Sequence, residues 1–138
     1  MLFGNSKLAN SLLNAILTEG ALSTMGQCSI LVYKNTIPTD QAALSFDPAT
    51  RSADLLGTFT NSTFSVTGNA ISLKQPPSAI TTPVAGTVTW AYIKGANSVG
   101  FIVDVGLAGS YSPLILDKLV CTAGGSLTVV EAGMSLVF

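Results

Sequence analysis

Seven carboxylates are the residues of this sequence that could carry acid–base chemistry. Hydrolysis of a glycoside needs two carboxyl groups about 5–10 Å apart across a cleft, and no local spacing pairs these seven. Histidine is absent from the 138 residues. This excludes Ser-His-Asp and Cys-His catalysis, and it excludes the usual zinc and iron sites that use histidine ligands. We therefore predict a non-enzymatic protein with no catalytic, cofactor or metal site. The carboxylates are Glu19, Asp40, Asp47, Asp54, Asp104, Asp117 and Glu131.

Two of the acidic residues stand in distinctive contexts. Asp104 interrupts the apolar run 101–105, where period-two alternation places it opposite Phe101, Val103 and Val105. An outward charge there provides a polar face and deters edge pairing. Asp47 opens the segment 47–51, which lacks the spaced oxygen ligands of an EF-hand loop. It is typical of a proline-led turn.

Two pairs of residues, one aromatic and one of cysteines, each allow two structural interpretations. Trp90 and Tyr92 are two positions apart and share one face of a strand. That face is either packed in the core, which the area of such rings favours, or exposed as a sugar-stacking platform together with Phe101. Cys28 and Cys121 could pair across strands, but nothing marks the chain for export, so we expect two buried thiols.

An amphipathic helix is predicted at the N-terminus, from Asn5 or Ser6 to Glu19, as a helical arm over residues 1–20. Leu8, Leu12 and Ile16 recur at four-residue spacing and form one apolar stripe. The stripe can cover an edge of the domain, or it can dock on a neighbouring subunit. We take its three residues as candidates for a subunit interface.

From residue 27 onward the hydrophobic period is two. Short apolar runs are separated by turn residues about every ten positions, and this pattern is typical of a β-sandwich of jelly-roll type. A closed barrel has the same periodicity and is the alternative. We predict one domain over 1–138, mainly β, with the sandwich over 27–138. The predicted strands are 28–34, 53–60, 63–67, 70–74, the two arms of the hairpin 86–107, 114–116, 127–130 and 134–138.

The segment 75–83 is predicted to be an exposed loop. It contains Pro76, Pro77 and Pro83, and proline cannot donate to a sheet ladder. We take it as a second candidate subunit contact, made by Gln75, Pro76, Pro77 and Ile80.

The composition favours assembly over a free monomer. Only 9% of the residues are charged, 48% are hydrophobic and the net charge is −1. Near-neutral surfaces tend to associate, and without a basic field nucleic acid is not an expected partner. There is no basic, apolar secretory leader and no run of about 18 apolar residues, so we expect neither export nor a membrane span.

Three segments resemble a family of small tailed-bacteriophage virion proteins, of the capsid decoration (cement) or minor capsid type. They are the helix SKLANSLLNAIL over 6–17, the hairpin GTVTWAYIKGANSVGFIVDVGL over 86–107, and the closing run GGSLTVVEAGMSLVF over 124–138. Together they cover about a third of the chain. The segments 75–83 and 107–113 depart from the family pattern.

The resemblance implies a non-enzymatic protein that assembles with itself, as trimers, and with the major capsid protein or other virion proteins. Its location would then be the virion, assembled in the cytoplasm of a bacterial host. A collar, neck or tail component is the alternative within virions. A carbohydrate-binding β-sandwich module that uses Trp90 and Tyr92 is the alternative from another class.

Overall fold

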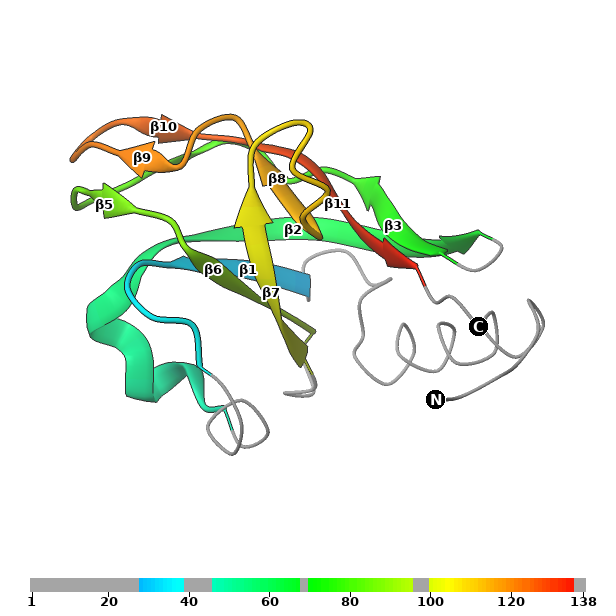
Figure 1. The fold of residues 1–138 in the computed structure, drawn as a ribbon, viewed down its shortest axis with the longest axis horizontal. Coiled ribbons are helices and arrows are strands. Elements are labelled where there is room, and N and C mark those ends of the chain that lie inside the picture. The colour runs from blue at the N-terminus through cyan, green and yellow to red at the C-terminus, as the bar shows by residue number, and fades with distance from the viewer. Residues whose placement is uncertain (1–27, 39–45, 68–69, 96–99, 136–138) are drawn as a thin grey trace.

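A computed structural model describes residues 28–38, 46–67, 70–95 and 100–135. The chain is mainly β, and seven strands close a barrel in the order β1-β2-β3-β11-β8-β7-β6 (Figure 1). Neighbouring strands are antiparallel except for β7 and β8, which run parallel. The barrel strands are β1 Cys28–Tyr33, β2 Leu55–Thr67, β3 Ala70–Gln75, β6 Trp90–Lys94, β7 Gly100–Gly106, β8 Leu114–Leu116 and β11 Val129–Ser135.

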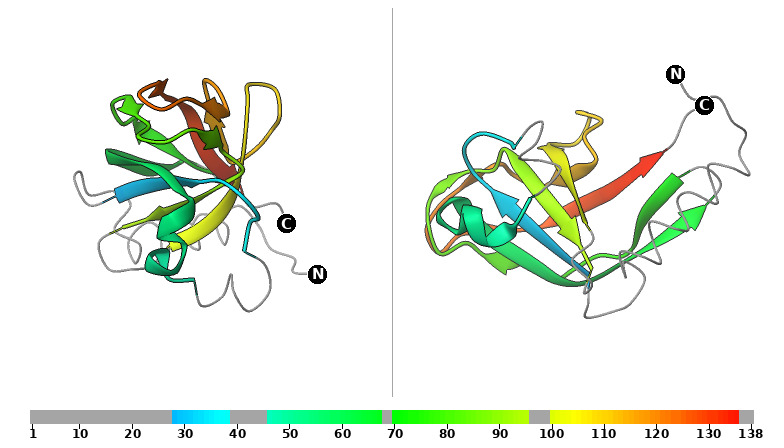
Figure 2. Two further views of the ribbon diagram at one scale, coloured as in Figure 1. Left: turned by 90° about the vertical axis from the view of Figure 1, so that its left-hand side faces the viewer. Right: turned by 90° about the horizontal axis from the view of Figure 1, so that it is seen from below.

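Two small sheets lie at one end of the molecule, opposite the ends of β3 and β11 (Figures 1 and 2). β4 (Ile80–Thr81) pairs with β10 (Ser126–Leu127), and β5 (Gly86–Thr87) pairs with β9 (Val120–Cys121). The buried Thr82 joins the two sheets, because its hydroxyl donates to the Thr122 carbonyl at 2.8 Å. Leu127 and Cys121 contribute to the main core, so these sheets close that end of the barrel.

The expectation of a sandwich is wrong, and the barrel alternative is the observed fold. β1 is hydrogen-bonded to β2 on one side and to β6 on the other, and β11 pairs with both β3 and β8. The ladder therefore closes on itself without separating into two sheets. Alternation in the sequence gives the face that a side chain occupies, but the pairing order of the strands depends on contacts between distant segments.

The barrel interior is filled by alternate residues of each strand. In β1, Ile30 and Val32 point into the main core, whereas Leu31 and Tyr33 pack in a second cluster with Trp90 and Tyr92. Both faces of β1 and β6 are thus buried, which accounts for their nearly continuous apolar sequences. Asp104 is exposed on β7 and its neighbour Val103 is buried, as the alternation predicts.

Several predicted strands are confirmed, with different boundaries. The hairpin predicted over 86–107 is confirmed in its central part, where β6 pairs antiparallel with β7, but Gly86 and Thr87 form the separate strand β5 and pair with β9. β2 pairs with β3 as expected. The predicted strands 53–60 and 63–67 are one continuous strand, β2. The predicted strand 127–130 is divided, because Leu127 ends β10 and Val129 begins β11, and β11 continues into the predicted strand 134–138 as far as Ser135. The predicted helix and its arm over 1–20 lie outside the described residues.

The expectation of an exposed loop over 75–83 is partly wrong. Gln75 ends β3, and Pro76 is exposed, but Pro77 is buried. Ile80 belongs to β4 and packs against the core beside Gly57. The prolines do stay outside the ladders. The partner of Ile80 in the sheet is Leu127, and a pairing over such a separation leaves no local signal in the sequence.

Candidate functional site

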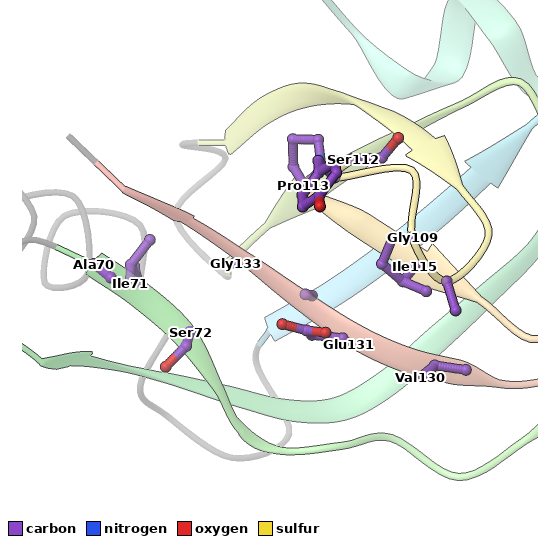
Figure 3. A pocket seen from close by; sticks show the side chains of 13 residues that line it. Ala70, Ile71, Ser72, Gly109, Ser112, Pro113, Ile115, Val130, Glu131 and Gly133 are labelled. Atoms are coloured by element: carbon purple, nitrogen blue, oxygen red, sulfur yellow. The ribbon is translucent and has the colours of Figure 1, made fainter. Parts of the chain in front are cut away.

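A groove lies on the outside of the barrel. It has a volume of about 540 Å³ and lies between β3, β11 and the loop 107–113 (Figure 3). In Figure 3 the Glu131 side chain extends from β11 toward β3. The lining residues are Ala70, Ile71, Ser72, Ala108, Gly109, Tyr111, Ser112, Pro113, Ile115, Val130, Glu131, Ala132 and Gly133.

The loop 107–113 forms one rim of the groove and connects the parallel strands β7 and β8. The Ser110 amide donates to the Leu107 carbonyl at 3.0 Å, and the Gly133 amide donates to the Pro113 carbonyl at 2.8 Å. The loop folds over Gly106, where a Cβ atom would lie 2.6 Å from the Ser112 Oγ. Glycine at 106 is therefore required by the close approach of the loop.

Tyr111 stands at the tip of this loop. Its side chain is 97% exposed, and its backbone φ of 60° lies in the left-handed region. A non-glycine residue in this region carries a conformational cost of about 1–2 kcal/mol. The hydrogen bonds on either side of Tyr111 hold the loop in this shape, so the phenol is presented to solvent from a fixed backbone.

A β-bulge shapes the opposite wall of the groove. The pairing of β11 with β8 shifts register between Val129 and Glu131, which leaves Val130 without a partner in that ladder. Because of this extra residue, two consecutive side chains point outward: Val130 is 56% exposed, and Glu131 is also exposed. Bulges commonly redirect a side chain in this way.

The side chains that line the groove determine which interactions it can make. Glu131 is the only charged side chain among the described residues that line it, and most of the other lining side chains are apolar or small. One carboxylate offers hydrogen-bond acceptors, and the described lining places no second carboxylate or base beside it. The groove can bind an apolar group that carries one donor.

Trp90 and Tyr92 are buried, so the alternative of core packing is confirmed for this pair. Trp90 is fully buried and stacks on Tyr33, with ring centroids 4.1 Å apart. Phe46 meets Tyr33, Trp90 and Tyr92 edge to face. These rings are therefore not available as an exposed sugar-stacking platform. A smaller hollow of about 250 Å³ lies beside this cluster, lined by Phe46, Asp47, Pro48, Tyr92 and Lys94.

Most of the described carboxylates have structural partners. Asp47 caps the 3₁₀ helix η1 (Pro48–Asp54) by accepting from the Ala49 amide at 3.0 Å, which confirms the predicted proline-led turn. Asp54 accepts from Asn35 and pairs with Arg51 at 3.3 Å. Asp117 accepts from the Thr128 amide at 2.9 Å. Glu19 and Asp40 lie outside the described residues.

The two cysteines are free and buried. Burial raises the pKa of Cys28 to about 11, and a hydrogen bond from Ser62 partly opposes this shift. The pKa of Cys121 is also raised, chiefly by burial. Since the thiolate is the reactive form, both side chains behave as small apolar core groups. No group of three or more His, Cys, Asp or Glu in the described ranges could hold a metal ion.

The residues that the sequence suggests for a subunit interface differ in where they lie. Leu8, Leu12 and Ile16 lie outside the described residues. Pro77 and Ile80 face inward, whereas Pro76 is exposed. No helix within the described ranges is long and apolar enough to cross a membrane. The role of both segments as subunit contacts stays a prediction.

Comparison of the chain with protein-family models, with curated proteins and with solved structures finds no significant match in any of the three. Candidate residues therefore come from the geometry of this molecule.

Neither the groove nor the role of Tyr111 is predicted by the sequence. The signal that could have found the loop is the small-residue segment Leu107–Pro113, with one aromatic residue, between two apolar strands. Val130 and Glu131 could not be recognised as outward-facing together, because regular alternation would place them on opposite faces.

Proposed function

We propose that this chain is a non-enzymatic structural protein of a tailed-phage virion, which decorates or cements the capsid lattice through subunit contacts. The observation that carries the binding role is the groove, which none of the described residues covers, with Tyr111 and Val130 exposed on its borders. Exposed apolar residues with polar neighbours are a feature of protein interaction sites. The virion assignment rests on the resemblance of three segments to the decoration and minor capsid family.

The low charge of the chain supports the same proposal. Charged residues make up 9% of the sequence, compared with about 25% in an ordinary soluble domain. Burial of such a surface against neighbouring subunits desolvates few charges, so each contact costs little in electrostatic free energy. A cement protein gains its effect by adding many such contacts to a lattice.

The assignment is tested by locating the protein in particles. Antibodies raised against the purified chain are used for immunogold electron microscopy of tailed-phage particles from cells that carry the gene. Label over the capsid surface is the expected result. Label confined to the neck or tail replaces the decoration role by the collar, neck or tail alternative, and absence of the chain from purified particles, measured by mass spectrometry, overturns the proposal.

The role of the N-terminal stripe is tested separately, by binding to those particles. The variant Leu8→Ser/Leu12→Ser/Ile16→Ser removes the apolar stripe, and Asn10→Ser/Asn14→Ser is the matched control on the other side of the predicted helix. We expect the triple variant to bind more weakly and the control to bind like the unmodified chain. Equal binding of both variants would remove the stripe from the interface.

A further inference from the structure

Tyr111 and the groove are complementary parts of the same face. The phenol is 97% exposed, so it does not fill the groove of its own chain. The groove has a volume of about 540 Å³ and is bordered by the very loop that carries Tyr111. A surface that holds both a protruding side chain and a hollow beside it can contact another copy of itself.

The chemistry of the groove matches a phenol. Val130, Ala108 and Pro113 supply accessible apolar surface for a ring, above a floor formed by the buried Ile71 and Ile115, and Glu131 supplies carboxylate oxygens at the wall. A tyrosine has an apolar body and one hydroxyl donor at its tip, and a buried tyrosine usually finds a partner for that hydroxyl. A hydrogen bond from the hydroxyl to Glu131 would use the one charged group that lines the groove.

The loop is also built to present Tyr111 without rearrangement. The Ser112 amide donates to the Ser110 Oγ at 3.4 Å, in addition to the bonds made by the Ser110 and Gly133 amides. A side chain held on a fixed backbone loses less conformational entropy when it binds. Tyr111 already has its left-handed backbone conformation in the single chain. The conformational free energy of that state is therefore not an additional cost of binding.

We propose that Tyr111 of one copy inserts into the groove of a second copy, with its hydroxyl donating to Glu131 there. Each copy contributes one tyrosine and one groove, so a closed dimer or ring satisfies all of them, and the measured mass gives the number of copies. The net charge of −1 and the low content of charged residues oppose self-association only weakly. The proposal does not rest on the virion assignment, since its test uses the purified chain alone.

The first test is sedimentation equilibrium of the purified chain and its variants. We expect an oligomer for the unmodified chain. Tyr111→Ser should raise the dissociation constant of this oligomer by at least about 30-fold, as for an interface hot spot. Tyr111→Phe keeps the ring and removes the hydroxyl donor, so the dissociation constant should rise by only about 5-fold. Val120→Ser changes another exposed apolar residue, 68% exposed on β9, and leaves the oligomer unchanged.

The second test identifies the contact itself. A tagged chain with Tyr111→Cys is mixed with an untagged chain with Val130→Cys under mild oxidation, and a disulfide between the tagged and untagged chains is expected. The natural cysteines are buried and do not compete. Replacing Val130→Cys by Val120→Cys is the control, and it forms no mixed disulfide above background.

Two results overturn the proposal. One is an unmodified chain that sediments as a monomer at every concentration. The other is an oligomer that Tyr111→Ser leaves equally stable. Thermal unfolding of each variant shows that it is folded, and since Tyr111 makes almost no contact with its own chain, unfolding of the variant is not expected.

Discussion

Two parts of the outer barrel surface have apolar side chains and differ in what covers them. On β1 and β6, the rings of Tyr33, Trp90 and Tyr92 are buried beneath Phe46. On β11 and the loop 107–113, Val130 and Tyr111 are exposed beside an open groove. The first face is covered by another segment of the chain, whereas none of the described residues covers the second.

The covered face is held by more than apolar contact. The Trp90 Nε1 donates to the Lys34 carbonyl at 3.3 Å, and the Arg51 guanidinium lies 5.6 Å from the centroid of the Trp90 ring. Arg51 also donates to the Thr36 carbonyl at 3.1 Å. Polar groups thus fix the covering segment in place. At the open face, the described hydrogen bonds fix the loop and leave the tip of Tyr111 free to contact a partner.

The largest effect is expected from Trp90→Ala. Removal of this fully buried ring leaves a cavity between Tyr33 and Phe46, and the free energy of unfolding should fall by about 3–5 kcal/mol. Urea unfolding followed by far-ultraviolet circular dichroism measures this change. Tyr111→Ser is the comparison from the open face, and it should change stability by less than about 0.5 kcal/mol. Similar losses for the two variants would contradict the contrast between the faces.

Phe46→Ala removes the side chain that covers the rings of Tyr33, Trp90 and Tyr92. Phe46 is half-buried and contacts three rings, so we expect a loss of about 2 kcal/mol, less than for a fully buried phenylalanine. The fluorescence of Trp90 should shift to longer wavelength and become accessible to acrylamide. Unchanged emission would show that Phe46 does not shield Trp90. Phe46→Leu is the control, since it keeps most of the apolar volume.

Gly106→Ala tests whether the shape of the open face is fixed by the loop. The added methyl group would collide with Ser110 and Ser112, so the loop must shift at a cost of about 1–2 kcal/mol. Self-association should weaken as well, because Tyr111 moves with the loop. Ser110→Gly in the same chain removes one of the colliding side chains and should restore part of the stability. Unchanged stability in Gly106→Ala would mean that the loop adapts freely.

The smallest effect is expected from Tyr33→Phe, and it has the opposite sign. The Tyr33 hydroxyl is buried and has no hydrogen-bond partner among the described residues. An unpaired buried hydroxyl is destabilising, so the phenylalanine variant should be more stable by about 1 kcal/mol. A loss of stability would show that the hydroxyl is hydrogen-bonded in solution.

The same residue gives a pH dependence. Burial, with a smaller contribution from Tyr92, raises the pKa of Tyr33 from 10.0 to about 12. The unfolded chain therefore releases this proton first as the pH rises, and stability that is present below pH 10 is lost between pH 10 and about 12. Urea unfolding at pH 8 and pH 11, under reducing conditions, should show a smaller loss in Tyr33→Phe. Cys28, with its pKa of about 11, adds a loss from pH 9 upward in both proteins.

Local features of the fold were predictable from the sequence. The alternation of Phe101, Val103 and Val105 with Asp104 gave the correct faces of β7, and Asp47 before Pro48 gave the turn that begins η1. These features depend on neighbouring residues, so a single stretch of sequence contains the necessary information. The interior position of Trp90 and Tyr92 followed from the large apolar area of their rings.

Features that depend on distant pairing were not predictable. The sandwich and the barrel share the same alternation, and the choice between them depends on pairs such as Gly133 with Ser72 and Val105 with Leu114. The groove depends on the bulge at Val130 and on the left-handed Tyr111, both of which depart from regular alternation and local preference. The candidate site therefore required the structure.

Closure of the barrel by β11 has a consequence for folding during synthesis. This strand follows the other described strands in the chain, yet it supplies the partners for both β3 and β8. Until residues 129–135 have left the ribosome, those two strands lack these ladder partners and keep apolar side chains available for wrong contacts. Formation of distant pairs is slow because the intervening chain must be ordered first. A ribosome-bound chain that ends before residue 129 should therefore remain sensitive to protease, and protection should appear in one late step.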